Sequence, residues 1–296
     1  MIQINEVSKV YDNHKKAIDN LTLSIDKGKF GLVGPNGAGK TTLMRMLATL
    51  IKPTSGQITI FDRRIDEKDE IRQMLGYLPQ HVGFHENLTV EQELDFFATM
   101  KHIVAKKDRQ RQLDVVLEYV NLNEVRKERI KTLSGGMKRR LGIAITMLNN
   151  PRLLIIDEPT AGLDPEERIR FRNLLIRLGE DQIVLLSTHI IEDISKVCNL
   201  LAIIDKGQLA FHGTTIELLS QAKEATWAIP SNEVSSLLSN DFVASRIVED
   251  EVKSIVLSDS KPTPNAQLIT PHMEDAYLWV LHKGGKACGE EGKKNL

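Results

Sequence analysis

Short, continuous apolar runs separated by helix-patterned stretches occupy the first three quarters of the chain. The runs do not alternate apolar with polar residues, which is typical of strands buried on both faces of a parallel sheet. Between two of them, residues 165–178 have the spacing of an amphipathic helix. The alternation of runs and helices predicts an α/β core. The runs are 29–33, 153–156, 183–186 and 200–204.

A helical pattern without strand-like runs interrupts this alternation from residue 86 to residue 131. We therefore expect a helical subdomain, at about 86–150, inserted between two halves of the α/β core. Its first helix should begin at a capping box, in which Thr89 is the N-cap and the Gln92 side chain reaches back.

The last quarter of the chain has a different pattern. Residues 243–248 and 252–257 read as two strands of a hairpin, and residues 273–281 read as a short helix. We expect a main α/β domain over 1–220, a small α+β extension over 221–283 and a disordered tail over 284–296, which is rich in glycine and charge.

Composition excludes several classes of protein. Among 296 residues, 41% are hydrophobic and the net charge is -1, so no global field draws the chain to nucleic acid or to anionic lipid. Cys198 and Cys288 match no metal-binding spacing and are expected to be reduced thiols. An apolar run near the ~18 residues of a membrane helix is lacking, so a membrane role would need a partner.

The most specific motif spans Gly34 to Thr41 and fits the pattern G-x-x-x-x-G-K-[ST] between an apolar run and a helix. Its glycines allow successive N–H groups to converge on phosphate oxygens. Lys40 then adds charge over the β- and γ-phosphates, and the Thr41 hydroxyl is a ligand for Mg²⁺. The expected phosphate-binding set is Gly34, Pro35, Asn36, Gly37, Ala38, Gly39, Lys40, Thr41 and Thr42.

Two carboxylates follow the apolar run 153–156 at the strand edge where ligands bind in open α/β sheets. Asp157 is expected to hold Mg²⁺, as in a Walker B motif. Glu158 is expected to orient or deprotonate an attacking water. The alternative is that Asp157 caps the next segment and Glu158 faces solvent.

A third motif, Leu133-Ser134-Gly135-Gly136, opens a helix that runs to about Leu148. Exposed N–H groups and the helix dipole favour an anion at such a helix start. Read alone, this segment is more commonly only a glycine-rich N-cap.

Together these three motifs resemble those of the nucleotide-binding subunit of ATP-binding cassette (ABC) transporters, over about residues 1–220. The resemblance implies an ABC-type P-loop core that hydrolyses ATP with Mg²⁺. It further implies that Tyr11 stacks on adenine, that Gln80 contacts the metal and the water, and that His189 is the switch histidine. The D-loop would be residues 161–164, ending at Asp164.

Each of these residues has a plainer alternative. Tyr11 could be a half-buried strand residue, Gln80 an ordinary loop residue and His189 a structural histidine. Asp164 precedes Pro165 and two glutamates, so helix capping alone would explain it.

The resemblance also implies that two cassettes stack head to tail, with each ATP between the P-loop of one and the signature of the other. Ser134, Gly135, Gly136 and Asp164 would then act in trans. The expected partners are a second cassette, here another copy of the chain, and a separately encoded membrane permease, but not nucleic acid. The chain would lie at the cytoplasmic face of the membrane through that permease.

Segments around the motifs resemble cassettes that export drugs or antibiotics. They include residues 77–80 and 87–90, and Met137 stands where import cassettes usually have Gln. The main alternative is a soluble ABC ATPase acting on the ribosome or nucleic acid, which usually has paired cassettes or long coiled-coil insertions. A P-loop kinase would not need the signature, and a non-catalytic module would be expected to lose Lys40 or Glu158.

Overall fold

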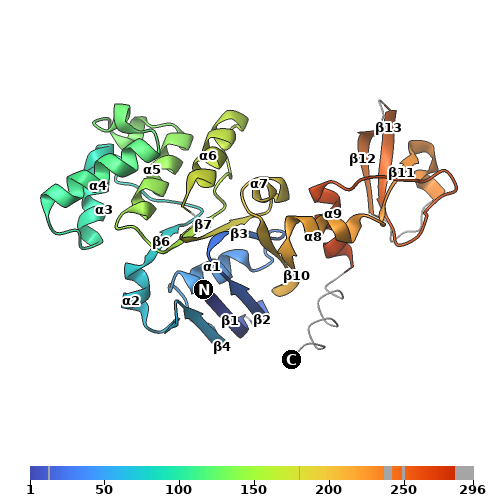
Figure 1. The fold of residues 1–296 in the computed structure, drawn as a ribbon, viewed down its shortest axis with the longest axis horizontal. Helices are drawn as coiled ribbons and strands as arrows, with labels where there is room; N and C mark the ends of the chain where they lie inside the picture. Colours follow the sequence, from blue (N-terminus) through green and yellow to red (C-terminus); the bar gives the residue numbers. More distant parts are fainter. Residues whose placement is uncertain (13, 180, 237–241, 249–250, 284–296) are drawn as a thin grey trace.

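The computed structural model describes residues 1–283 except 13, 180, 237–241 and 249–250. The predicted tail and Cys288 lie outside the described residues. In Figure 1 the molecule is elongated, with a group of helices at one end, an antiparallel sheet at the other and the nucleotide-binding motifs between them.

A six-stranded sheet in the order β10-β9-β3-β8-β7-β6 forms the centre of the molecule. All neighbours are parallel except β10, which is antiparallel to β9. The four predicted runs fall on β3, β7, β8 and β9, which confirms the parallel core. The strands are β3 (Gly28–Val33), β6 (Leu75–Leu78), β7 (Leu153–Asp157), β8 (Ile183–Thr188), β9 (Leu200–Asp205) and β10 (Gln208–Thr214).

Both faces of this sheet are buried, each against a different hydrophobic cluster. Leu153 and Ile155 of β7 pack with the N-terminal strands and with α1 (Lys40–Leu47). Leu154 and Ile156 of the same strand pack with the helices on the other face. Burial on both faces explains why the runs are continuously apolar.

An antiparallel sheet of order β2-β1-β4-β5 covers the α1 side of the core, and the sequence did not predict it. Register shifts interrupt the pairing of β1 with β2 and with β4. Such bulges break the two-residue period by which an antiparallel strand is recognised in a sequence. The strands are β1 (Ile2–Val10), β2 (Lys16–Ile25), β4 (Ser55–Ile60) and β5 (Arg63–Arg64).

The helices at one end of the molecule come from the stretch where the sequence predicted an insertion (Figure 1). The capping box at the start of α3 is confirmed: the Gln92 N–H donates to Thr89 Oγ1 at 3.2 Å, and the Thr89 N–H donates to Gln92 Oε1 at 2.9 Å. The helices of this group are α3 (Val90–Met100), α4 (Lys106–Tyr119) and α5 (Gly135–Met147), with 3-10 turns at Asn123–Val125 and Ile130–Thr132. Helix α2 (Lys68–Gln73) precedes the predicted insertion and contacts β6.

The predicted C-terminal hairpin and helix are confirmed as β12, β13 and α9. The sheet has the order β12-β13-β11-β14, whereas Ala276, Trp279 and Val280 of α9 join the hydrophobic cluster of the main core. The remaining elements are α6 (Pro165–Arg177), α7 (Ile191–Ser195), α8 (Thr215–Ala222), β11 (Thr226–Pro230), a 3-10 helix (Ser231–Ser236), β12 (Phe242–Val248), β13 (Glu251–Leu257), β14 (Gln267–Leu268) and α9 (Met273–His282).

Among the described residues, the helices are all too short or too polar to cross a membrane.

The cap of α3 gives a test of the fold. We expect Thr89→Ala to lower the free energy of unfolding by about 1 kcal/mol, because the Gln92 N–H loses its acceptor. Thr99→Ala is the matched control, since the exposed Thr99 hydroxyl only donates to the Asp95 carbonyl within the same helix. It should change stability by no more than about 0.5 kcal/mol. Equal losses in urea unfolding of the two variants would contradict the capping role.

Candidate functional site

The loop between β3 and α1 approaches other backbone segments too closely for side chains at two of its glycines. Gly39 has a φ of +110°, and a Cβ there would lie 2.3 Å from the Ala17 carbonyl oxygen. A Cβ on Gly34 would lie 2.2 Å from the Ile204 carbonyl oxygen. Gly39 also provides no side-chain cap for α1, so the N–H groups at this helix start remain available to an anion.

Lys40 is buried at the start of α1 and points back over the loop. Its Nζ donates to the carbonyl oxygens of Gly34 at 2.7 Å and Pro35 at 3.2 Å, and lies 3.7 Å from Glu158 Oε1. Burial lowers the pKa of the Lys40 ammonium, and the carboxylates of Glu158 and Asp157 oppose this shift. The loop carbonyls are neutral acceptors. The charged oxygens of a polyphosphate in the loop would bind the Lys40 ammonium more strongly.

The ends of β7 and β8 bring the acidic pair next to Ser187 and His189. Asp157 pairs in register with Ser187, whose hydroxyl donates to Asp157 Oδ1. The Glu158 N–H donates to the Ser187 carbonyl at 3.0 Å, and His189 Nδ1 lies 3.0 Å from Glu158 Oε2. One carboxylate oxygen of Glu158 therefore faces Lys40 and the other faces His189.

The backbone of Glu158 has a φ of +48°, which is rare for a residue with a side chain. Such conformations cost of order 1–3 kcal/mol and cluster at functional sites. Glu158 is itself buried. Together, these features mark it as a residue whose position is imposed by its surroundings.

These groups open onto one cleft of about 550 Å³. Tyr11 stands at its rim, 39% exposed, with its hydroxyl 3.5 Å from Thr42 Oγ1. Gly34, Pro35 and Ala38 belong to the loop but do not line the cleft, and Asp157 lies buried directly before Glu158. The predicted residues that do line it are Tyr11, Asn36, Gly37, Gly39, Lys40, Thr41, Thr42, Gln80, Glu158 and His189.

The signature residues and Asp164 do not line this cleft. The Ser134 hydroxyl accepts from the Met137 N–H at 3.2 Å as the N-cap of α5. A Cβ placed on Gly135 would meet no atom within 4 Å. Asp164 Oδ1 accepts from the Glu167 N–H at 2.9 Å, so the predicted cap of α6 is confirmed. Ser134, Gly135 and Asp164 are all exposed and thus accessible to another molecule.

The residues in and beside the cleft include oxygen groups of the kind that bind Mg²⁺. Asp157 Oδ2 is buried and has no hydrogen-bond partner, which leaves an anionic oxygen for a cation. Thr41 and Gln80 add a hydroxyl and an amide, both oxygen ligands that Mg²⁺ accepts. No group of three or more His, Cys, Asp or Glu side chains in the described part of the chain could hold a metal by itself.

Sequence reasoning missed three residues near these groups: Ser187, Lys15 and Arg139. Ser187 contacts Asp157, and its place two residues before His189 at the end of a strand could have revealed it. Lys15 lines the cleft from the loop before β2, which carries no motif. Arg139 lies three residues beyond the signature glycines and donates to the Gln80 and Glu158 carbonyls.

Comparison with known proteins relates the chain to ATP-binding proteins of ABC transporters. A family model described as "ABC transporter" matches residues 18–161. The chain is 32% identical over 300 residues to the uncharacterized ABC transporter ATP-binding protein YxlF of Bacillus subtilis, covering 95% of this chain and 100% of the relative. It is 36% identical over 224 residues to the linearmycin resistance ATP-binding protein LnrL of Bacillus subtilis. This match covers 75% of this chain and 71% of the relative.

A solved structure supports the fold. It is the dimeric, post-hydrolysis state of the ATP-binding cassette MJ0796 bound to ADP and Pi, and it matches with a TM-score of 0.66 and 24% identity. The match covers 72% of this chain and 98% of that chain.

The Ser187–Asp157 contact generates a prediction. We expect Ser187→Ala to lower the free energy of unfolding by about 1–3 kcal/mol, because the buried carboxylate of Asp157 loses its donor. Ser195→Ala, which removes only a hydroxyl bonded to the Glu192 carbonyl, is the control and should have little effect. Urea unfolding measures both, and a Ser187→Ala protein as stable as the control would refute the role of this contact.

Proposed function

The chain belongs to the ATP-binding cassette family of ABC transporters, and from this premise we propose that it works as one of two cassettes that share their ATP molecules. It is the ATP-hydrolysing subunit of such a transporter. The proposal concerns how the site is completed, which residues act in it and what it drives.

One observation carries the shared-site proposal. The cleft gathers the P-loop, Gln80, Glu158 and His189, whereas the exposed Ser134 and Gly135 lie outside it. A γ-phosphate in the P-loop would thus lack the amides of a signature on one side. A second copy that presents its signature there would close the site, so that ATP stabilises the dimer as an interface ligand.

Within the closed site the side chains of this chain would divide the work. The loop amides and Lys40 bind the phosphates, and Tyr11 stacks on the adenine at the rim. Glu158 takes a proton from the attacking water, and His189, held against Glu158 at 3.0 Å, orients the carboxylate and the γ-phosphate. Bound through Thr41, Gln80 and Asp157, Mg²⁺ would neutralise charge on the phosphates.

We further propose that the dimer drives a separate membrane permease and works in export. Support comes from the relative LnrL, which is named for resistance to linearmycin. The permease would dock at a pocket of about 800 Å³ lined by residues of α2, the start of β6 and the end of α3. The chain would then reside at the cytoplasmic face of the membrane.

The first test removes the proposed base. We expect Glu158→Gln to lower kcat for ATP hydrolysis by about 10²- to 10⁴-fold, because the amide cannot accept the proton. ATP should still bind, and light scattering should show an ATP-dependent dimer that persists. Glu118→Gln on the exposed face of α4 is the control and should hydrolyse ATP at the parent rate. A normal rate in Glu158→Gln would refute the assignment.

The second test addresses sharing between copies. Lys40→Ala removes phosphate binding in cis, while Ser134→Asp keeps an N-cap acceptor on α5 but places a carboxylate opposite the phosphate. We expect each variant alone to be inactive. Mixed, they form dimers in which one site combines an intact Lys40 with an intact Ser134, so activity should return in proportion to mixed dimers. No recovery on mixing, with both variants folded and dimerising, would rule out the shared site.

A further inference from the structure

Arg139 on α5 donates five hydrogen bonds to main-chain carbonyl oxygens of two separate segments. Four of them have N···O distances of 2.8 to 3.4 Å. Burial lowers the pKa of its guanidinium, and the carboxylates of Asp157 and Glu158 oppose that shift. The acceptors are the carbonyl oxygens of Pro79, Gln80, Asp157, Glu158 and Pro159.

These two segments carry groups of the proposed hydrolytic site on adjacent strands. Gln80 follows β6, and Glu158 follows β7, which is paired in parallel with β6. Nη1 of Arg139 donates to the Gln80 carbonyl at 2.8 Å, while Nη2 donates to the Asp157 carbonyl at 2.8 Å and to the Glu158 carbonyl. A single planar group therefore fixes the spacing between the two segments.

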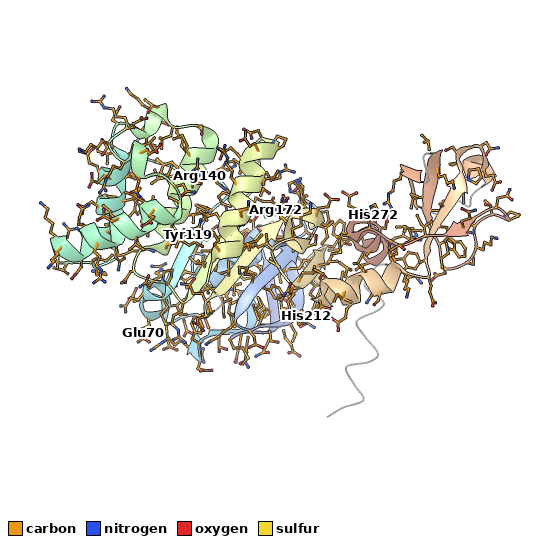
Figure 2. The ribbon with its side chains drawn as sticks, turned by 45° about the horizontal axis from the view of Figure 1, so that its top comes forward. Glu70, Tyr119, Arg140, Arg172, His212 and His272 are labelled. Carbon is orange, nitrogen blue, oxygen red and sulfur yellow. The ribbon has the colours of Figure 1, made fainter. Side chains whose placement is uncertain are left out.

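The neighbouring basic residues of α5 make different contacts. Lys138 Nζ pairs with Glu86 Oε1 at 2.9 Å. Arg140, labelled in the helical part of Figure 2, donates to the carbonyl oxygens of Val120 and Asn121, both at 3.2 Å. The bridge between the β6 and β7 ends is thus specific to Arg139 among these three residues.

We propose that Arg139 is a positioning residue that clamps Gln80 and Glu158 into their working geometry and ties both to the signature helix. The inference rests on the proposed function. Arg139 lies about one helical turn beyond Gly135, so a shift of the helix start on the partner's ATP would move the guanidinium with it.

Arginine suits this role because its guanidinium presents five donors in a rigid fork. Glutamine offers two donors and no charge, and lysine offers three donors on one compact atom. Neither can reach carbonyls on both segments at once in the same geometry. Because the acceptors are backbone atoms, the effect should fall on the placement of Glu158 and Gln80 rather than on the P-loop.

The test is the steady-state kinetics of Arg139→Gln in the full chain. We expect kcat to fall about 10- to 100-fold, as small misplacements of reacting groups do, with KM for ATP within about twofold of the parent. Arg109→Gln is the matched control, since Arg109 also donates to carbonyl oxygens, those of Ile103 and Val104, and pairs with Asp95 in the helical part. It should leave kcat unchanged.

The mixed dimer separates positioning from general weakening of α5. In it, the Ser134→Asp copy contributes Lys40 and Glu158 to the active site, and the Lys40→Ala copy contributes the signature. Arg139→Gln should lower kcat when placed in the copy that supplies Glu158, and should have little effect in the copy that supplies only the signature. Equal loss from either copy, or no loss, would overturn the inference.

Two further outcomes are decisive. If the mixture of Ser134→Asp and Lys40→Ala is itself inactive, the proposal of a shared site is wrong. If the mixture is active and Arg139→Gln does not change its activity, only the inference about Arg139 is wrong. If Arg139→Gln does not fold, Arg139→Lys, which keeps the charge, should fold and show an intermediate kcat with KM unchanged. Failure of both to fold would make Arg139 a stability residue and overturn the proposal.

Discussion

The site depends on the alignment of parallel strand ends in the central sheet. β3, β8, β7 and β6 are consecutive neighbours, and their carboxyl ends lie at one edge. Register places Val33 beside Thr188, and Ser187 beside Asp157. The segments that follow these strands are therefore brought together by backbone hydrogen bonding alone: the P-loop, His189, Glu158 and Gln80. Each side chain needs only a short local turn to reach the cleft.

The charged groups at this edge are the Lys40 ammonium and the carboxylates of Asp157 and Glu158, and their arrangement leaves room for a polyanion. Lys40 lies between loop carbonyls and Glu158, and burial already disfavours its charged form. Asp157 has one oxygen satisfied by Ser187 and one without a partner. The unpaired Asp157 oxygen leaves a buried group incompletely satisfied, which costs free energy that a nucleotide with its cation would recover. The stored cost is consistent with a site completed by ligand.

The sequence correctly predicted the strand ends that are followed by motifs with candidate functional residues. The loop at Gly34–Thr41 and the pair Asp157 and Glu158 each follow a continuous apolar run, so motif and element supported each other. It could not find Arg139, because its contacts join residues 18 to 60 positions away and depend on where α5 crosses the ends of β6 and β7. The N-terminal antiparallel sheet was missed because bulges in β1 interrupt its alternation. Both failures concern long-range geometry rather than local preference.

The signature helix is the element in which these features meet. Ser134 and Gly135 at its start are exposed and lie outside the cleft of their own chain. Its buried face includes Leu141 and Ala144 of the main core, and Arg139 reaches the ends of two strands. In the proposed dimer, such a helix would be fixed at its middle by packing and at its start by the nucleotide of the second copy, which would leave it few ways to move independently. Interfaces packed in this way tend to adopt discrete arrangements rather than deform continuously. Arg139 joins this helix to the carbonyl oxygens of Gln80 and Glu158 through one guanidinium, so the placement of the proposed hydrolytic groups depends on how α5 packs.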